Sequence, residues 1–303
     1  MFKHILVPLD GSRLAESALG MAASLAKKFD ASLTLIHVIE RDAPSEIHSE
    51  RHLVSADEAS AYLDEVAHLS SLAGVRVSTH VHTSQVIDVA ESVTEHSTEL
   101  APDLIVMSRH GRGGARRLLF GDIAQQIIAR GKTPVLVVRP TTDVRGESSS
   151  ADWRTILAPI DGDPSHEKGL PVASDLALAF RCRLHLLMVV PTIGKLGGFQ
   201  AALSLLLPGT TRVKLEMDSA SARDYLSARE KELQGAGVHA GSETSRGDPA
   251  RAIIRAARRL TADLVVMGTH GRAGTDAFWA GSVAAQVVAR ASVPLLLVPL
   301  KEK

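Results

Sequence analysis

The chain runs through the same succession of segments twice, and this repeat constrains its fold more than any other feature. Residues 4–10 read His-Ile-Leu-Val-Pro-Leu-Asp and residues 155–161 read Thr-Ile-Leu-Ala-Pro-Ile-Asp, at an offset of 155 − 4 = 151. Further along, Gly111 and Gly271 lie in related loops at an offset of 271 − 111 = 160. A repeat of about 150 residues predicts two domains of one fold, and a length of 303 residues agrees with that number.

Within each half, short apolar runs alternate with segments of helical spacing. In the first half we expect strands over 4–9, 32–39, 75–82, 103–107 and 134–138. The helix that runs to Glu99 is expected to be capped by Ser84, and a helix in the second half to begin at Asp248-Pro249. Strands that are apolar along their length indicate a parallel sheet covered by helices on both faces.

The fold class is therefore α/β, with two tandem doubly wound five-stranded parallel sheets. We place a first domain at residues 1–140, a linker rich in Ser and Thr at 141–152, and a second domain at 153–303. The last apolar runs, 134–140 and 294–299, are bracketed by prolines, and an edge strand this hydrophobic needs covering. We expect these two strands to meet across a pseudo-twofold axis, so that the chain resembles a fused dimer.

Composition argues against several classes of partner. The chain has 34 basic and 34 acidic side chains and only 3% aromatic residues, which disfavours nucleic acid as a partner. No stretch approaches the ~18 apolar residues of a membrane span, so we expect a soluble cytoplasmic protein. Cys182 is the single cysteine. It is interpreted as a plain strand cysteine, although the arginines on either side leave a lowered thiol pKa open.

One stretch has the features of a phosphate site. Residues 268–282 read Gly-Thr-His-Gly-Arg-Ala-Gly-Thr-Asp-Ala-Phe-Trp-Ala-Gly-Ser, between an apolar run of strand type and a segment of helical spacing. Glycines let backbone N–H groups turn toward an anion, and the start of a helix offers free N–H groups and a favourable dipole. Together these features predict phosphate binding.

Other candidate ligand residues follow the strands of the same half. Asp161 ends the first strand and Val189 lies at the end of the second, so both reach the carboxyl edge of the sheet, where open α/β folds bind ligands. Asp161 could accept hydrogen bonds from ribose hydroxyls or hold a phosphate-bound Mg²⁺ through water. The alternative is that the glycines serve only turns and caps, because a short glycine motif is a weak signal.

The residues Pro159-Ile160-Asp161 and the pattern Gly268-x2-Gly271-x9-Gly281-Ser282 resemble the universal stress protein family of UspA type. The resemblance covers both halves. It implies a fold related to the adenine nucleotide α-hydrolases, dimerisation through the last strand, and binding of ATP. The candidate contacts are Pro159, Asp161, Val189, Met267, Gly268, His270, Gly271, Arg272, Gly281, Ser282 and Val283.

The first half departs from this pattern at two positions. Ser108 replaces the first glycine and Asp122 replaces the serine. Two like charges at about 4 Å repel by about 4 kcal/mol at an effective dielectric of 20, and an aspartate also caps its own helix. Arg109, Arg112, Arg116 and Arg117 could offset the charge, or they form a solvated loop face. We predict that the nucleotide binds the second half, and the first half weakly or not at all.

The histidines suggest no catalytic or metal site. His270 is interpreted as ordering its loop rather than as an acid or base, because no nucleophile or carboxylate pair lies nearby in sequence. His48 and His52, and His80 and His82, have spacings that metals tolerate but lack further ligands, so they are interpreted as scattered surface histidines.

The sequence therefore favours a regulatory stress-response protein that binds ATP, optionally with Mg²⁺, and that presents an altered arrangement to an unidentified protein partner. The chain has neither a Gly-x4-Gly-Lys-Ser/Thr loop nor a Gly-x-Gly-x-x-Gly after its first strands, which argues against P-loop NTPases and dehydrogenases. Two alternatives stay open: a slow metal-assisted hydrolase of ATP or phosphoesters that uses Asp161, and a structural scaffold. A further homodimer is also left open.

Overall fold

The computed structural model of this chain describes residues 1–43, 46–47, 50–109, 122–140, 150–190, 192, 206–269 and 282–300. The chain forms two compact units, Met1–Asp152 and Trp153–Thr269, the second completed by the last helix and strand of the chain. Each unit is described by itself, and the pairing of the two final strands stays a prediction.

The first unit is built on five parallel strands in the order β7-β6-β1-β2-β5. These strands are β1 (His4–Pro8), β2 (Ser32–Glu40), β5 (Arg76–Val86), β6 (Leu104–Ser108) and β7 (Val135–Val138). A small antiparallel hairpin, β3 (Glu46–Ile47) and β4 (Glu50–Arg51), lies apart from this sheet. The chain moves outward from β1 through β2 to β5, then returns to the other side of β1 with β6. This reversal opens a crevice at the carboxyl ends of β1 and β6.

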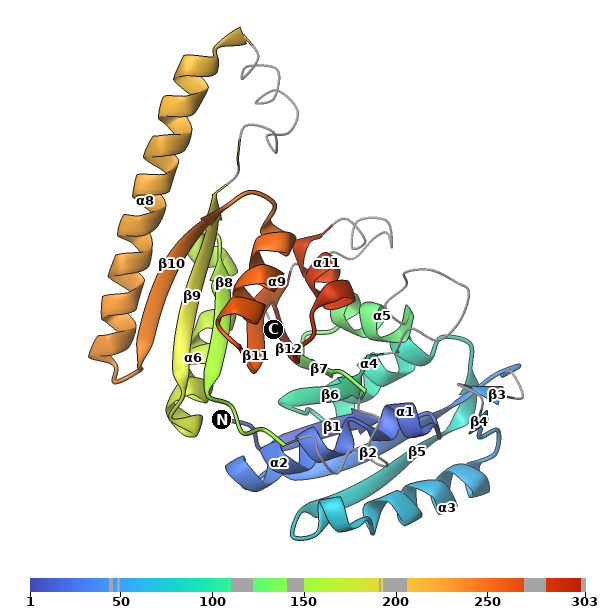
Figure 1. Ribbon diagram of the computed structural model, residues 1–303. Helices are drawn as coiled ribbons and strands as arrows, with labels where there is room; N and C mark the ends of the chain where they lie inside the picture. Colours follow the sequence, from blue (N-terminus) through green and yellow to red (C-terminus); the bar gives the residue numbers. More distant parts are fainter. Residues whose placement is uncertain are drawn as a thin grey trace. The chain divides into compact units, whose positions relative to one another are not determined.

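Helices cover both faces of this sheet, as the apolar strands require (Figure 1). Contacts with the strands and with each other group α2 with α3 on one face and α4 with α5 on the other. The helices of the unit are α1 (Arg13–Glu16), α2 (Leu19–Phe29), α3 (Ala56–Ala67), η1 (Ser70–Leu72), α4 (Val89–Glu99) and α5 (Asp122–Arg130).

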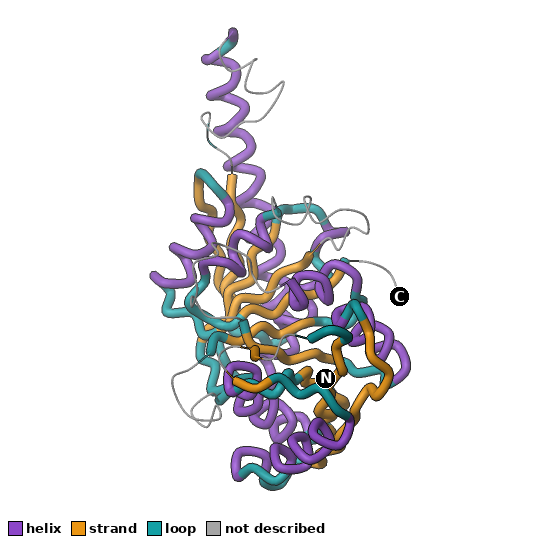
Figure 2. Tube along the Cα trace, turned by 90° about the vertical axis from the view of Figure 1, so that its right-hand side faces the viewer, coloured by secondary structure: helices purple, strands orange, loops and turns teal. Residues whose placement is uncertain are grey.

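The second unit repeats this topology with the strand order β10-β9-β8-β11-β12, again all parallel. Its strands are β8 (Thr155–Ile160), β9 (Arg183–Val190), β10 (Ala240–Arg246), β11 (Leu264–Thr269) and β12 (Leu295–Pro299). Its helices are η3 (Pro164–His166), α6 (Gly169–Phe180), α8 (Pro208–Gly235), α9 (Pro249–Arg259) and α11 (Val283–Arg290). Figure 2 shows the strands lying between helical layers.

The predicted fold class is confirmed, with corrections at several helix ends. The segment between β1 and β2 forms two helices, α1 and α2, interrupted at Ser17–Ala18, and α8 begins at Pro208, a residue that suits the first turn of a helix. The cap predicted at Ser84 is wrong, because Ser84 lies within β5 and Asp88 caps α4 by accepting from the N–H of Glu91 at 2.9 Å. The predicted start at Asp248-Pro249 is confirmed, with Asp248 accepting from the N–H of Arg251 at 2.9 Å.

The edge strands depart from the expected apolar pattern. The central strands β1, β6, β8 and β11 are mostly buried, whereas β5 is half-buried to exposed along its length and β10 is half-buried toward its end. Among the described residues, β5 and β10 each pair with a single neighbouring strand, so their polar side chains can reach solvent. None of the helices in the described part of the chain is long and apolar enough to cross a membrane.

Cys182 is buried, but it lies immediately before β9 rather than within the strand, where the sequence had suggested it. Burial raises the pKa of its thiol to about 11, so the flanking arginines do not produce a reactive thiolate. We therefore expect a disulfide reagent such as dithionitrobenzoate to leave the folded protein unmodified at pH 8 and to label one thiol per chain after unfolding in urea. Rapid labelling of the folded protein would contradict this assignment.

Candidate functional site

The candidate site of the second unit lies where β8 and β11 end side by side. The two strands pair through Ile156 with Leu264 and through Leu157 with Val265, so the residues after them emerge at one edge of the sheet. Pro159 is half-buried near the end of β8, and Val189 is half-buried near the end of β9. These positions bring Pro159 and Val189, two of the predicted nucleotide contacts, to the crevice of the sheet.

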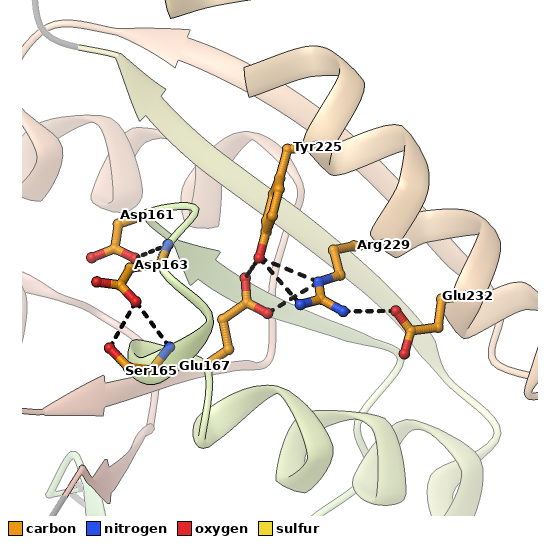
Figure 3. A network of polar contacts seen from close by, with 7 residues as sticks. All are labelled: Asp161, Asp163, Ser165, Glu167, Tyr225, Arg229 and Glu232. Atoms are coloured by element: carbon orange, nitrogen blue, oxygen red, sulfur yellow. Dashed lines mark hydrogen bonds and ion pairs between the residues drawn. The ribbon is translucent and has the colours of Figure 1, made fainter. Parts of the chain in front are cut away.

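The turn after β8 holds Asp161 in a fixed position. One carboxylate oxygen of Asp161 accepts from the N–H of Asp163 at 3.0 Å, and the other lies 2.7 Å from Nδ1 of His166 (Figure 3 shows the Asp161–Asp163 part of this turn). Asp163 in turn accepts from the N–H and the hydroxyl of Ser165, at 2.9 and 2.7 Å. The turn passes through Gly162 at φ +84°, where side chains are strained.

The hydrogen bond to Asp161 raises the pKa of His166 above its ordinary value of 6.5. A raised pKa means that this pair stabilises the fold below pH 6.5 and that the contribution is lost as the pH rises through the folded-state pKa. We expect an NMR titration of the His166 ring to give a pKa above 6.5 that falls back toward 6.5 in Asp161→Asn. An unchanged titration in that variant would show that Asp161 does not hold the imidazole.

A second set of polar contacts joins this turn to helix α8. Glu167 follows η3 and is only 8% exposed; its carboxylate accepts from the hydroxyl of Tyr225 at 2.7 Å and pairs with Nε of Arg229 at 3.1 Å (Figure 3). Arg229 also pairs with Glu232 at 2.8 Å. Burial and the bond to Glu167 raise the pKa of Tyr225, so its hydroxyl keeps its proton.

The first unit contains a related contact that the sequence interpretation missed in both halves. Tyr62 of α3 donates to Glu16 at 3.1 Å, and burial raises the pKa of Tyr62. Glu16 and Glu167 differ by 167 − 16 = 151, the offset of the repeat, so aligning the halves on their first strands would have suggested both glutamates. The tyrosines differ by 225 − 62 = 163 instead, so an alignment at an offset of 151 does not match them and does not reveal the Glu–Tyr contact.

Gly268 has a packing role inside β11. A Cβ atom at this position would lie 2.6 Å from the backbone oxygen of His166 and 2.9 Å from a methyl group of Leu300. The contact is equally close from the facing segment: a Cβ at Gly169, the first residue of α6, would lie 3.2 Å from the backbone nitrogen of Gly268. The structure therefore brings Gly268 against the segment that carries the partner of Asp161, while the preceding Met267 is buried.

Ser282 begins the last helix. Its φ of −71° and ψ of 153° are those of an N-cap, and its hydroxyl oxygen accepts from the N–H of Ala285 at 3.1 Å. The hydroxyl proton can still be donated to a ligand, beside the free N–H groups and positive dipole end of α11. Val283, the first residue of the helix, is half-buried. The remaining predicted contacts, His270, Gly271, Arg272 and Gly281, lie outside the described residues.

The corresponding crevice of the first unit encloses a cavity of about 80 Å³ at the ends of β1, β2 and β6. Its lining includes Asp10, which accepts from the N–H and hydroxyl of Ser12 at 2.9 and 2.6 Å. It also includes His37, whose Nδ1 bonds the carbonyl of Leu9 at 2.8 Å and whose pKa is lowered by burial. At the offset of 151, the residue that matches His37 is Met188, so the two crevices differ in polarity.

Part of the interpretation of the remaining histidines was wrong. His52 is buried and lines the cavity of the first unit, while His48 lies outside the described residues. His80 and His82 are joined by His96 of α4, whose ring lies 4.6 Å from that of His80 and whose Nε2 is 2.8 Å from Nδ1 of His82. Among the residues that the structure describes, no group of three or more His, Cys, Asp or Glu is arranged to hold a metal ion.

Comparison with known proteins identifies the relatives of this fold. The sequence profile of the universal stress protein family matches residues 1–139 and again residues 152–299. The chain belongs to the universal stress protein family. Both matched ranges contain a complete five-stranded unit, so the family fold occurs twice in the chain.

Relatives of tandem and of single length both exist. A universal stress protein of Mycolicibacterium smegmatis is 26% identical over 303 residues, covering 97% of this chain and 96% of its own. The universal stress protein MJ0531 of Methanocaldococcus jannaschii is 31% identical over 145 residues, covering 46% of this chain and 83% of its own. The crystal structure of a universal stress protein from Archaeoglobus fulgidus superposes with a TM-score of 0.68 at 17% identity, covering 98% of this chain and 96% of that one.

Proposed function

We propose that this universal stress protein binds one adenine nucleotide, ATP, in its second unit and that the bound state is transmitted to helix α8. The observation that carries the proposal is the position of Ser282 as the N-cap of α11, at the same edge of the sheet as Asp161 and Gly268. The first unit begins the matching helix α5 at Asp122, where an additional negative charge opposes a phosphate.

The donor set fits a nucleotide. Ser282 and the first N–H groups of α11 supply hydrogen-bond donors and a positive dipole end for phosphate oxygens. Asp161, with 59% of its side chain exposed, supplies an acceptor for ribose hydroxyls at the end of β8. Pro159 and Val189 supply half-buried apolar surface for the base. Bound ATP would contribute the phosphate charge that these donors stabilise.

The alternative of a metal-assisted hydrolase fits this turn less well. Both carboxylate oxygens of Asp161 already accept hydrogen bonds, from Asp163 and His166, so a directly bound metal would have to displace His166. A water-mediated Mg²⁺ requires no such displacement. ATP turnover that is lost in Asp161→Asn and in Ser282→Ala would favour the hydrolase, and turnover that survives both replacements would count against it.

The decisive experiment measures both identity and stoichiometry. Nucleotide released by denaturing the purified protein is identified by mass spectrometry, and calorimetry then measures ATP binding to the stripped chain. We expect one tight site per chain, lost in Gly271→Val. Two tight sites per chain would contradict the inequality of the units, and a protein that neither carries nor binds adenine nucleotide would contradict the proposal as a whole.

Transmission to α8 gives a separate prediction. Glu167, six residues after Asp161, is held by Tyr225 and Arg229 of α8, so a ligand that orders the Asp161 turn also orders its attachment to the helix. We expect ATP to slow amide hydrogen exchange around Tyr225 in the wild-type chain. The variant Tyr225→Phe removes the hydroxyl but keeps the ring, and should bind ATP within about fivefold of wild type, since one hydrogen bond contributes about 1 kcal/mol. Because Arg229 still pairs with Glu167, the α8 amides of this variant should respond less strongly to ATP than those of the wild type. An unchanged response would show that the Tyr225–Glu167 bond does not connect the helix to the site.

A further inference from the structure

Two equivalent helices of this chain have exposed faces of opposite charge. Helix α4 of the first unit and helix α9 of the second each begin after an aspartate cap, Asp88 and Asp248, at an offset of 248 − 88 = 160. Their burial patterns agree except at Val89/Pro249 and Ser97/Ala257, and the alanine at the second residue of each helix is buried. The two helices therefore present corresponding faces to solvent.

The acidic stripe of α4 consists of Glu91, Glu95 and Glu99, all exposed. At the offset of 160 the matching positions of α9 are Arg251, Arg255 and Arg259, also exposed, and Arg258 extends this basic stripe. Helix α4 contains no Lys or Arg, and α9 contains no Asp or Glu. Each glutamate of the acidic stripe thus has an arginine at the matching position of the basic stripe.

Among the described residues, each stripe has a polar side-chain partner at its last position only. Glu99 bonds Nδ1 of His96 at 2.9 Å, and Arg259 pairs with Glu243 of β10. In the described part of the chain, Glu91, Glu95, Arg251 and Arg255 have no ion pair. Like charges four residues apart on one helix repel each other, so each stripe is stabilised when it meets a surface of opposite charge.

The geometry of the two stripes is matched. Residues four apart on a helix are separated by about 6 Å along the axis, and both stripes repeat at that interval over three positions. Two such helices laid side by side, parallel or antiparallel, bring three glutamates opposite three arginines. A generic acidic partner would account for the basic stripe alone, and a generic basic partner for the acidic stripe alone.

We propose that the acidic stripe of α4 in one copy of this chain docks on the basic stripe of α9 in a second copy. The chain has 34 basic and 34 acidic side chains, so two copies carry no net repulsion and local complementarity decides their approach. Each chain carries both stripes, so two copies can form a twofold dimer through two reciprocal contacts, whereas a single contact between each pair of chains builds a closed ring or a longer assembly. Exposed ion pairs of this kind are individually weak and are screened by salt, so the association is reversible.

Charge reversal tests the proposal on the full-length chain by sedimentation velocity. At an ionic strength of about 20 mM, where screening is weak, we expect the wild type to associate with rising protein concentration and to dissociate at about 0.5 M salt. The variants E91K/E95K and R251E/R255E should each weaken self-association by at least about tenfold. Mixing the two variants, or combining all four substitutions in one chain, should restore it. These positions are exposed, and the substitutions leave Glu99 and Arg259 in place.

The control variant is D175K/D224K, which raises the net charge by as much as E91K/E95K does, on exposed positions of α6 and α8. It should associate as the wild type does. A wild-type chain that stays monomeric at every concentration and salt would overturn the proposal. So would equal weakening by the control, or a failure of the two oppositely charged variants to associate with each other. Binding of a labelled oligonucleotide that depends on Arg251 and Arg255, in a chain that stays monomeric, would assign the basic stripe to a polyanion instead.

Discussion

Replacing Ser282 by aspartate is expected to lower the affinity of the second unit for ATP about a thousandfold. The variant places the residue type of Asp122 at the matching position, and a carboxylate at about 4 Å from a phosphate costs about 4 kcal/mol at an effective dielectric of 20. Aspartate is as good an N-cap as serine, so the bond to the N–H of Ala285 can still form and α11 should remain intact. Calorimetry measures the loss of affinity, and circular dichroism checks the helix content.

The matched control is Ser282→Thr, which keeps both a hydroxyl and a cap and should bind ATP nearly as the wild type does. The reverse exchange, Ser108→Gly with Asp122→Ser, removes both departures of the first half and is expected to raise the stoichiometry from one site toward two. Equal affinity of Ser282→Asp and Ser282→Thr would show that phosphate does not approach the start of α11.

Replacing Gly268 by alanine is expected to destabilise the second unit by about 2 to 3 kcal/mol. The added methyl carbon would lie 2.6 Å from the backbone oxygen of His166, and neither β11 nor the η3 segment can shift without disturbing its hydrogen bonds. Urea unfolding followed by fluorescence provides the measurement, since Trp153 is buried in this unit.

Gly209→Ala in α8 is the matched control, because nothing lies within 4 Å of a Cβ at that position. Alanine favours a helix over glycine by up to about 1 kcal/mol, so this variant should be unchanged or slightly more stable. A Gly268→Ala protein as stable as the wild type would contradict the close packing of β11 against His166. Because the chain has two units, the two unfolding transitions are fitted separately.

The architecture could be predicted from the sequence because it depends on patterns that repeat. The sequence pattern that begins at His4 begins again at Thr155, which identified the duplication. The apolar strands indicated a parallel sheet covered on both faces. The cap of α4 was misplaced because Ser84 and Asp88 both have side chains that cap helices, and the choice depends on how far β5 pairs with β2. That pairing is a tertiary property, which local sequence does not encode.

The candidate site was predicted unevenly for a similar reason. Asp161 directly follows β8 and Ser282 directly precedes α11, and both of these elements can be recognised from their apolar residues. The structure places both residues at the edge of the sheet where β8 and β11 end. The turn partner His166 and the anchor Glu167–Tyr225–Arg229 were missed, since such contacts join residues distant in sequence or form only once a turn has its shape. Gly268 was assigned to an anion, and its contact with a backbone oxygen became visible only with neighbouring segments in place.

The glutamate–tyrosine hydrogen bond that recurs in both units also indicates where the chain can gain residues without loss of the fold. From Glu16 to Tyr62 the chain advances 62 − 16 = 46 positions, and from Glu167 to Tyr225 it advances 225 − 167 = 58, yet each pair of side chains meets. The offset is still 151 at the start of β9, so the twelve additional residues lie between β9 and Tyr225. This stretch is therefore the natural position for inserting a peptide tag or a reporter without moving the helix on its sheet.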